Sequence, residues 1–82
     1  MLDERMKELV AIGAAITANC QPCLEYHAAK AREFGVDDAD ILAAVKVAQQ
    51  VRRGAIAKMD RFAAQQVTGL NADAAPTGCE CQ

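Results

Sequence analysis

The stretch that decides the fold runs from Asn19 to His27 and reads NCQPCLEYH. Asparagine is among the best residues for the position just before a helix, so Asn19 is expected to cap one here. Pro22 then falls in the first turn of that helix, where its missing backbone N–H breaks no hydrogen bond. Because residues three and four positions apart share one helix face, Cys20, Cys23 and His27 are expected to lie together. The pattern therefore predicts a helix with two thiols and an imidazole on one face.

The rest of the chain is also expected to be helical. Of its 82 residues, 52% are hydrophobic, only 4% are aromatic and 18 are alanine. Alanine is the best helix former and a poor strand residue. Apolar residues recur at helical spacing over residues 3–18, 37–51 and 55–67. With the helix that begins at Asn19, these stretches predict an all-α fold, a helical bundle of about four helices.

The ends of these helices carry recognisable signals. Asp3 is expected to cap the first helix, and Gly35 is expected to end the second. The run Arg52-Arg53-Gly54 is expected to kink or break the helical pattern and so to separate the last two helices. The sequence predicts one helical domain over residues 1–69, closed by a glycine, and a flexible tail over residues 70–82, which is small and polar.

Size and charge bound the function. Alanine buries little area, and a chain this short builds only a small core, so we expect the bundle to be completed by oligomerisation. A formal net charge of −2 gives no basic footprint for nucleic acid. No apolar run approaches the ~20 residues of a membrane span. Since the charged start lacks the layout of a signal peptide, a cytoplasmic location is expected. In such a reducing compartment cysteines are more often catalytic or metal-binding than structural.

The motif suggests thiol chemistry. At a helix N-terminus, unpaired N–H groups and the helix dipole lower the pKa of a thiol and favour the nucleophilic thiolate. On this ground alone Cys20 is expected to be the more exposed and more acidic thiol of the pair. His27, one turn beyond Cys23, can take or deliver the proton that thiol chemistry moves. Two thiols at this spacing can also close into a disulfide, so the site can cycle between dithiol and disulfide.

The pattern Cys-x-x-Cys-x-x-x-His at the start of an alanine-rich helix resembles the alkylhydroperoxidase AhpD-like core of the carboxymuconolactone decarboxylase-like superfamily. That family also places a glutamate twelve residues before the first cysteine, and in this sequence that position is Glu8. Phe34-Gly35-Val36, followed by an acidic restart of the chain, fits the family as well. The resemblance covers roughly residues 4–68, which is nearly everything except the tail.

The resemblance implies a thiol-dependent peroxidase or disulfide oxidoreductase. Cys23 would attack a peroxide such as an alkyl hydroperoxide and become a sulfenic acid. Cys20 would resolve it to a disulfide, which a thiol or dithiol donor would reduce. His27 and Glu8, through a water, would relay the proton that activates Cys23. The resemblance also implies a homo-oligomer, with a trimer or hexamer favoured, and no cofactor is expected.

This sequence departs from the family pattern in two respects. AhpD proper has a histidine between the cysteines, where this chain has Pro22. It is also about twice as long and contains a second copy of the helical unit. Decarboxylase members of the superfamily generally lack the cysteine pair, so the presence of the pair argues against lactone decarboxylation.

Other interpretations of the cysteines stay open. Cys20, Cys23 and His27 could be ligands of a metal or metalloid, with Cys79 or Cys81 from the tail as a further ligand. The tail pair, with one residue between its thiols, could instead pass electrons to the Cys20/Cys23 disulfide as a redox shuttle, or clamp a soft metal. It could also be incidental. A further alternative is an assembly or interaction module whose cysteines are vestigial.

Overall fold

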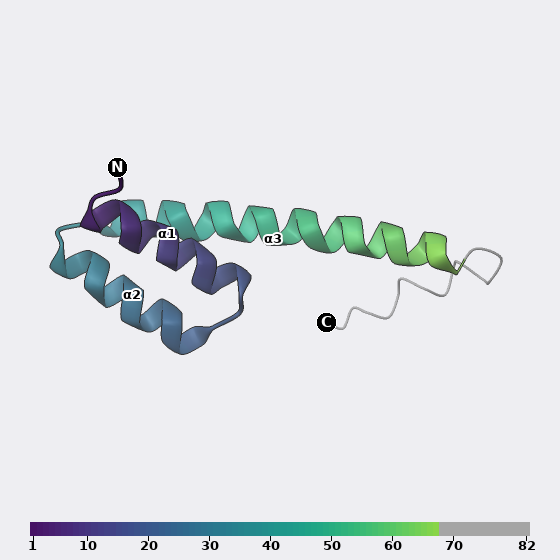
Figure 1. Cartoon of the computed structure of the whole chain (residues 1–82), viewed down its shortest axis with the longest axis horizontal. Coiled ribbons are helices and arrows are strands. Elements are labelled where there is room, and N and C mark those ends of the chain that lie inside the picture. The colour runs from purple at the N-terminus through teal and green to yellow at the C-terminus, as the bar shows by residue number, and fades with distance from the viewer. Residues whose placement is uncertain (68–82) are drawn as a thin grey trace. The chain divides into compact units, whose positions relative to one another are not determined.

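The structure is a computed structural model and describes residues 1–67. It contains the helices α1 (Glu4–Thr17), α2 (Gln21–Glu33) and α3 (Asp38–Gln66), and none of the described residues forms a strand (Figure 1). The all-α prediction is confirmed. The expected helix end at Gly69 and the expected tail over residues 70–82 lie outside the described residues.

The predicted break at Arg52-Arg53-Gly54 is wrong, because α3 runs through it without interruption. The described part of the chain therefore has three helices rather than about four. A glycine inside a helix costs about 1 kcal/mol relative to alanine, but it keeps its N–H and does not force a break as proline does. By its internal contacts the chain divides near this point into two compact units, Met1–Arg52 and Arg53–Gln82.

The ends of α1 and α2 follow local rules. The Asp3 carboxylate accepts a hydrogen bond of 2.8 Å from the backbone N–H of Met6, so its predicted role as the cap of α1 is confirmed. The predicted role of Gly35 is also confirmed, since α2 ends just before it and its φ is +86°. In that left-handed conformation glycine has no Cβ to clash with the backbone.

Asn19 does not cap α2 as predicted, since Cys20 holds the cap position. Instead Asn19 ends α1, with a left-handed φ of +58°. Its backbone N–H donates to the Ile16 carbonyl at 3.1 Å, and that of Cys20 donates to the Ala15 carbonyl at 3.0 Å. This pair of bonds is the Schellman arrangement, in which asparagine is the usual substitute for glycine. Asparagine suits both kinds of helix end, and the C-terminal role prevails here.

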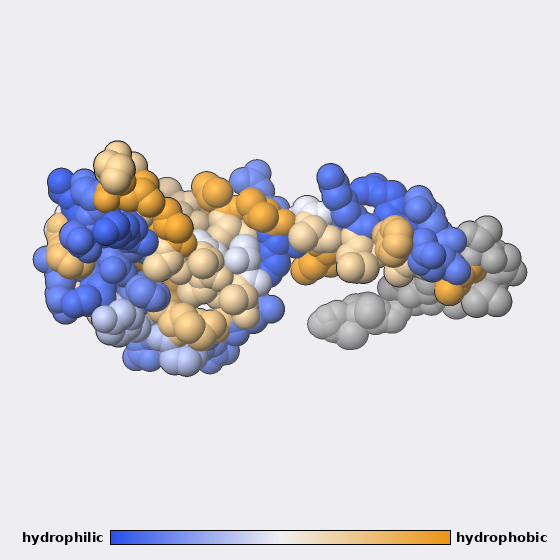
Figure 2. Space-filling model, in the orientation of Figure 1, coloured by the Kyte–Doolittle hydropathy of each residue, from blue (hydrophilic) through white to orange (hydrophobic). Residues whose placement is uncertain are grey.

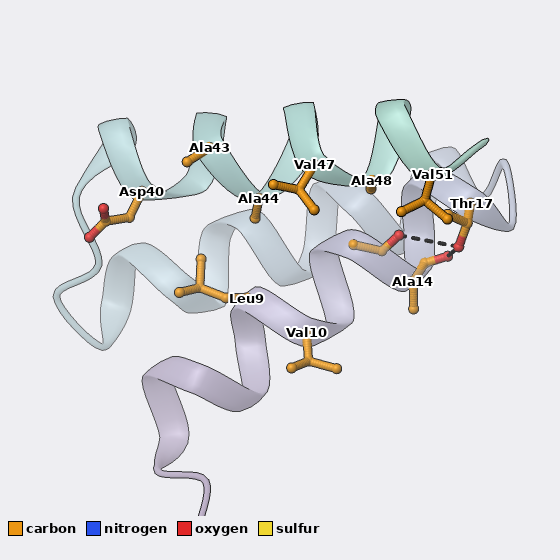
Figure 3. Close-up of a pocket in the computed structure, with 11 residues that line it drawn as sticks. Leu9, Val10, Ala14, Thr17, Asp40, Ala43, Ala44, Val47, Ala48 and Val51 are labelled. Atoms are coloured by element: carbon orange, nitrogen blue, oxygen red, sulfur yellow. Dashed lines mark hydrogen bonds between the residues drawn. The ribbon is translucent and has the colours of Figure 1, made fainter. Parts of the chain in front are cut away.

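The core lies within the first unit and joins all three helices. Its buried members are Ile12, Ala31, Val36 and Ile41, with Leu9, Leu24, Ala44 and Val45 packed against them. The core is small, because many large apolar side chains of the described residues stay at the surface (Figure 2). Val10, Val47 and Val51 are each 59% exposed. They line a groove of about 690 Å³ between α1 and the N-terminal part of α3, together with several alanines (Figure 3).

Every helix within residues 1–67 is too short or too polar to cross a bilayer.

Candidate functional site

The packing of α1 against α2 brings Glu8 and His27 together across 19 residues of sequence (Figure 1). The Glu8 Oε1 and His27 Nδ1 atoms are 2.7 Å apart, and the side chains are 14% and 31% exposed. Because an ionised carboxylate only accepts hydrogen bonds, we assign the proton in this contact to Nδ1. The other ring nitrogen, Nε2, is then left to accept a proton. Glu8 thereby fixes the tautomer and the orientation of the imidazole.

The two cysteines of the motif lie at the start of α2, where they form a disulfide with a Cα–Cα distance of 5.2 Å. Cys20 is the N-cap residue, and Cys23 lies in the first turn, four positions before His27. Residues at that spacing share a helix face. The site therefore has a disulfide-bonded cysteine pair at the positive end of α2, with the Glu8-supported imidazole one turn further along the helix.

The expectation that Cys20 is the more exposed of the pair is wrong. Cys23 is exposed, whereas Cys20 is half-buried. Cys20 is partly covered because it lies next to the α1–α2 turn, where it lines a small pocket with Ala15, Leu24 and Arg52. Cys23, one turn further along α2, is open to solvent.

Two further side chains contact this site. The Tyr26 ring meets the His27 ring edge-on, with centroids 5.0 Å apart and an interplanar angle of 83°. Arg52 Nη1 donates hydrogen bonds to the Ile16 carbonyl at 2.9 Å and to Asn19 Oδ1 at 2.8 Å. Arg52 is not among the residues predicted from the sequence, because its partners lie 36 and 33 positions away. An arginine beside a second arginine looks like the solvated end of a helix, so no local signal could have identified it.

Cysteine, histidine and carboxylates form the usual metal sites, but residues 1–67 hold no group of three or more of them that could bind an ion. Cys79 and Cys81, which the metal hypothesis and the shuttle hypothesis both use, lie outside the described residues.

Comparison with known proteins identifies the family. The model described as "Carboxymuconolactone decarboxylase family" matches residues 1–66, and the chain belongs to this family. The chain is also 39% identical, over 54 residues, to "Uncharacterized protein 4 in cox locus" of Paracoccus denitrificans. That match covers 66% of this chain and 49% of the relative, so the chain spans about half the length of the curated relative. No solved structure matches the chain. The resemblance found in the sequence is thus confirmed at the level of the family.

Proposed function

We propose that this protein is a thiol–disulfide oxidoreductase that reduces peroxides through a Cys20/Cys23 dithiol–disulfide cycle. One observation carries the proposal. The cysteine pair opens the same helix that holds His27, and Glu8 from another helix supports His27 at 2.7 Å. Membership of a family that includes AhpD-like enzymes is compatible with this activity. A disulfide with a purely structural role would need no carboxylate-supported imidazole on the same helix.

In the oxidative half of the cycle, His27 Nε2 accepts the thiol proton of Cys23, through a water, and Glu8 stabilises the resulting imidazolium. The Cys23 thiolate attacks the terminal oxygen of the peroxide, and the O–O bond breaks. The sulfur is oxidised to a sulfenic acid, while the leaving alkoxide takes the proton from His27 and departs as an alcohol. The Cys20 thiol then attacks the Cys23 sulfur, which forms the disulfide and releases water.

In the reductive half, two electrons come from a thiol or dithiol donor. Its thiolate attacks one sulfur of the disulfide and gives a mixed disulfide, and a second thiol releases the donor as its own disulfide. Both cysteines return to the thiol form. Each turnover thus consumes one peroxide and two thiol equivalents.

The test is a thiol count on the full chain in which the tail cysteines are replaced, Cys79→Ser/Cys81→Ser. After reduction and removal of the reductant, stoichiometric peroxide is added and free thiols are titrated. We expect two thiols to disappear and to return with dithiothreitol, and Cys23→Ser to abolish the reaction. Retention of both thiols under peroxide would refute the proposal. Zinc that survives dialysis and protects the thiols would instead support the metal hypothesis.

The role of the tail is tested by the same substitution. If Cys79 and Cys81 pass electrons to the active-site pair, the double variant turns over more slowly than the unmodified chain with a thiol donor in excess. Equal turnover of the two proteins would show that the tail cysteines carry no electrons.

We further propose that the chain acts as a homo-oligomer, with a trimer or hexamer expected. The large exposed apolar side chains of α1 and α3 support this, since stable monomers seldom leave so much apolar surface in contact with water. The native mass by light scattering coupled to size-exclusion chromatography tests it. A mass equal to one chain would refute the proposal.

A further inference from the structure

Arg52 occupies a defined place beside the first cysteine. Its Nη1 donates both hydrogen bonds, to the Ile16 carbonyl and to Asn19 Oδ1. Ile16 lies in the last turn of α1 and Asn19 immediately precedes Cys20, so the two bonds hold the Arg52 guanidinium close to the start of α2. A guanidinium has five N–H donors, and the remaining three lie on Nη2 and Nε. Among the described residues these two atoms have no hydrogen-bond partner.

The guanidinium and Cys20 line the same pocket, which has a volume of about 190 Å³. Asn19 and Gln21 add neutral polar groups, the other lining residues are apolar, and none of the lining residues is acidic. Cys23 does not line it. The Arg52 guanidinium thus keeps three free donors and has no carboxylate in the pocket to neutralise its charge. It suits an anionic group that can accept two parallel hydrogen bonds.

We propose that this pocket binds the carboxylate of a small thiol reductant on Arg52 and so directs the thiol to Cys20. The inference rests on the proposed redox function and adds the chemical class of the electron donor. The donor thiolate attacks Cys20 Sγ, the Sγ–Sγ bond breaks, and Cys23 leaves as a thiolate that takes a proton by way of His27. A second donor thiolate attacks the donor sulfur of the mixed disulfide. It releases the oxidised donor and the Cys20 thiolate, so two thiols supply the two electrons.

The attack on Cys20 rather than Cys23 follows from the position of the groups. Of the Cys20/Cys23 pair, Cys20 lines the pocket with Arg52, whereas Cys23 lies one helical turn before His27. The incoming charge is therefore bound on the Cys20 side. The outgoing charge is neutralised on the other side, where His27 Nε2 can pass on a proton that it takes from water.

The experiment measures the rate at which the oxidised full chain is reduced by two small thiols that differ in charge. The probes are 3-mercaptopropionate, which carries a carboxylate, and 2-mercaptoethanol, which is neutral. Each rate is divided by the thiolate concentration, and the charge preference is the ratio of the two rates. Comparing this ratio between proteins removes the intrinsic reactivity of each thiol. The variants are Arg52→Gln and Arg52→Lys, and the matched control is Arg53→Gln, which removes the neighbouring positive charge.

We expect Arg52→Gln to lower the charge preference by about threefold to fivefold, the effect of one solvent-accessible ion pair. Arg53→Gln should leave the preference unchanged, and Arg52→Lys should retain part of it, since lysine keeps the charge but not the fork. Added salt should lower the preference of the unmodified protein, because it screens the attraction. Asn19→Gly keeps a residue that accepts the positive φ but removes one hydrogen-bond acceptor of Arg52. It therefore tests whether Arg52 acts through its bond to the turn or through its charge. We expect this variant to retain the preference.

An Arg52→Gln protein that reacts more slowly with both thiols by the same factor would overturn the inference, because Arg52 would then only support the turn. A preference that is insensitive to salt in the unmodified protein would overturn it as well, and this arm holds even if Arg52→Gln fails to fold. A failure of the proposed peroxide reduction gives a different result. In that case the thiols reduce the disulfide with the expected charge preference, but the reduced protein does not consume peroxide.

Discussion

Replacing Glu8 by glutamine tests the reasoning about the site most directly. The substitution keeps the size of the side chain and a hydrogen-bond acceptor, but it removes the negative charge 2.7 Å from His27 Nδ1. The amide can also present its NH₂ group to the ring, which would favour the tautomer with the proton on Nε2. In either case Glu8→Gln weakens the base that takes the proton from Cys23.

The size of the effect follows from the contact. A hydrogen bond to a charged group contributes about 1.5–3 kcal/mol. The Glu8 and His27 side chains are 14% and 31% exposed, so solvent screens part of their interaction. We therefore take the lower end of that range. Since about 1.4 kcal/mol corresponds to a factor of ten in rate, Glu8→Gln should slow peroxide-driven disulfide formation about tenfold.

The assay is stopped-flow measurement of thiol loss in the reduced protein with excess hydroperoxide. Glu4→Gln is the matched control, because Glu4 lies one turn earlier on the same helix. Its side chain is 61% exposed, and its ion pair with Lys7 spans 3.9 Å. The control should react at the rate of the unmodified protein. If Glu8→Gln and Glu4→Gln react at the same rate, Glu8 does not act through His27 and the proposed relay is wrong.

Three predictions concern two helix ends and one position inside a helix, each measured as the free energy of unfolding in urea. Asp3→Ala removes the acceptor of the Met6 N–H and should cost about 1 kcal/mol. Gly35→Ala forces a Cβ into a backbone with a φ of +86° and should cost roughly 1–2 kcal/mol, although no atom lies within 4 Å of the added methyl. Gly54→Ala adds the same methyl inside α3, also with nothing within 4 Å, and should stabilise the protein by about 1 kcal/mol.

The two glycine variants control for each other, because the chemical change is the same and only the backbone conformation differs. Equal effects on stability would show that conformation does not decide the outcome at these positions. An unchanged free energy for Asp3→Ala would show that the cap of α1 does not contribute to folding.

Local signals predicted the parts of the fold that depend on local chemistry. The cap at Asp3 and the helix end at Gly35 each rest on one residue and its near neighbours, and both are confirmed. Asn19 was mistaken for a cap of the second helix because the same side chain suits both ends of a helix. The choice depends on the preceding turn, whose two Schellman bonds the sequence does not reveal. The break predicted at Gly54 is wrong because a glycine, too, does not decide the local structure alone. A helix tolerates a glycine when its neighbours are good helix formers.

The site divides in the same way. The spacing of Cys20, Cys23 and His27 within one helix follows from helical periodicity, and the sequence was sufficient for it. The position of Glu8 required the family resemblance, because its contact with His27 depends on how two helices pack. Arg52 had no such guide. Its place beside Cys20 depends on the path of α3 past the α1–α2 turn, and neither periodicity nor a motif encodes that path.

The position of Cys20 at the cap of α2, which the sequence predicts for Asn19, changes the chemistry expected of Cys20. As the cap residue, Cys20 has the non-helical backbone angles φ −106° and ψ 99°, and its own side chain makes no cap hydrogen bond to α2. A cap side chain normally accepts from the N–H groups of the second or third helical residue. Pro22 is the second residue and has no N–H, so the backbone N–H of Cys23 is the donor best placed for a Cys20 thiolate. In the proposed cycle the Cys20 thiolate forms in the last step, when the second donor thiolate attacks the mixed disulfide and the oxidised donor departs. The start of α2 therefore stabilises Cys20 as the leaving group of the last step, while His27 passes a proton to Cys23, the leaving group of the first reductive step.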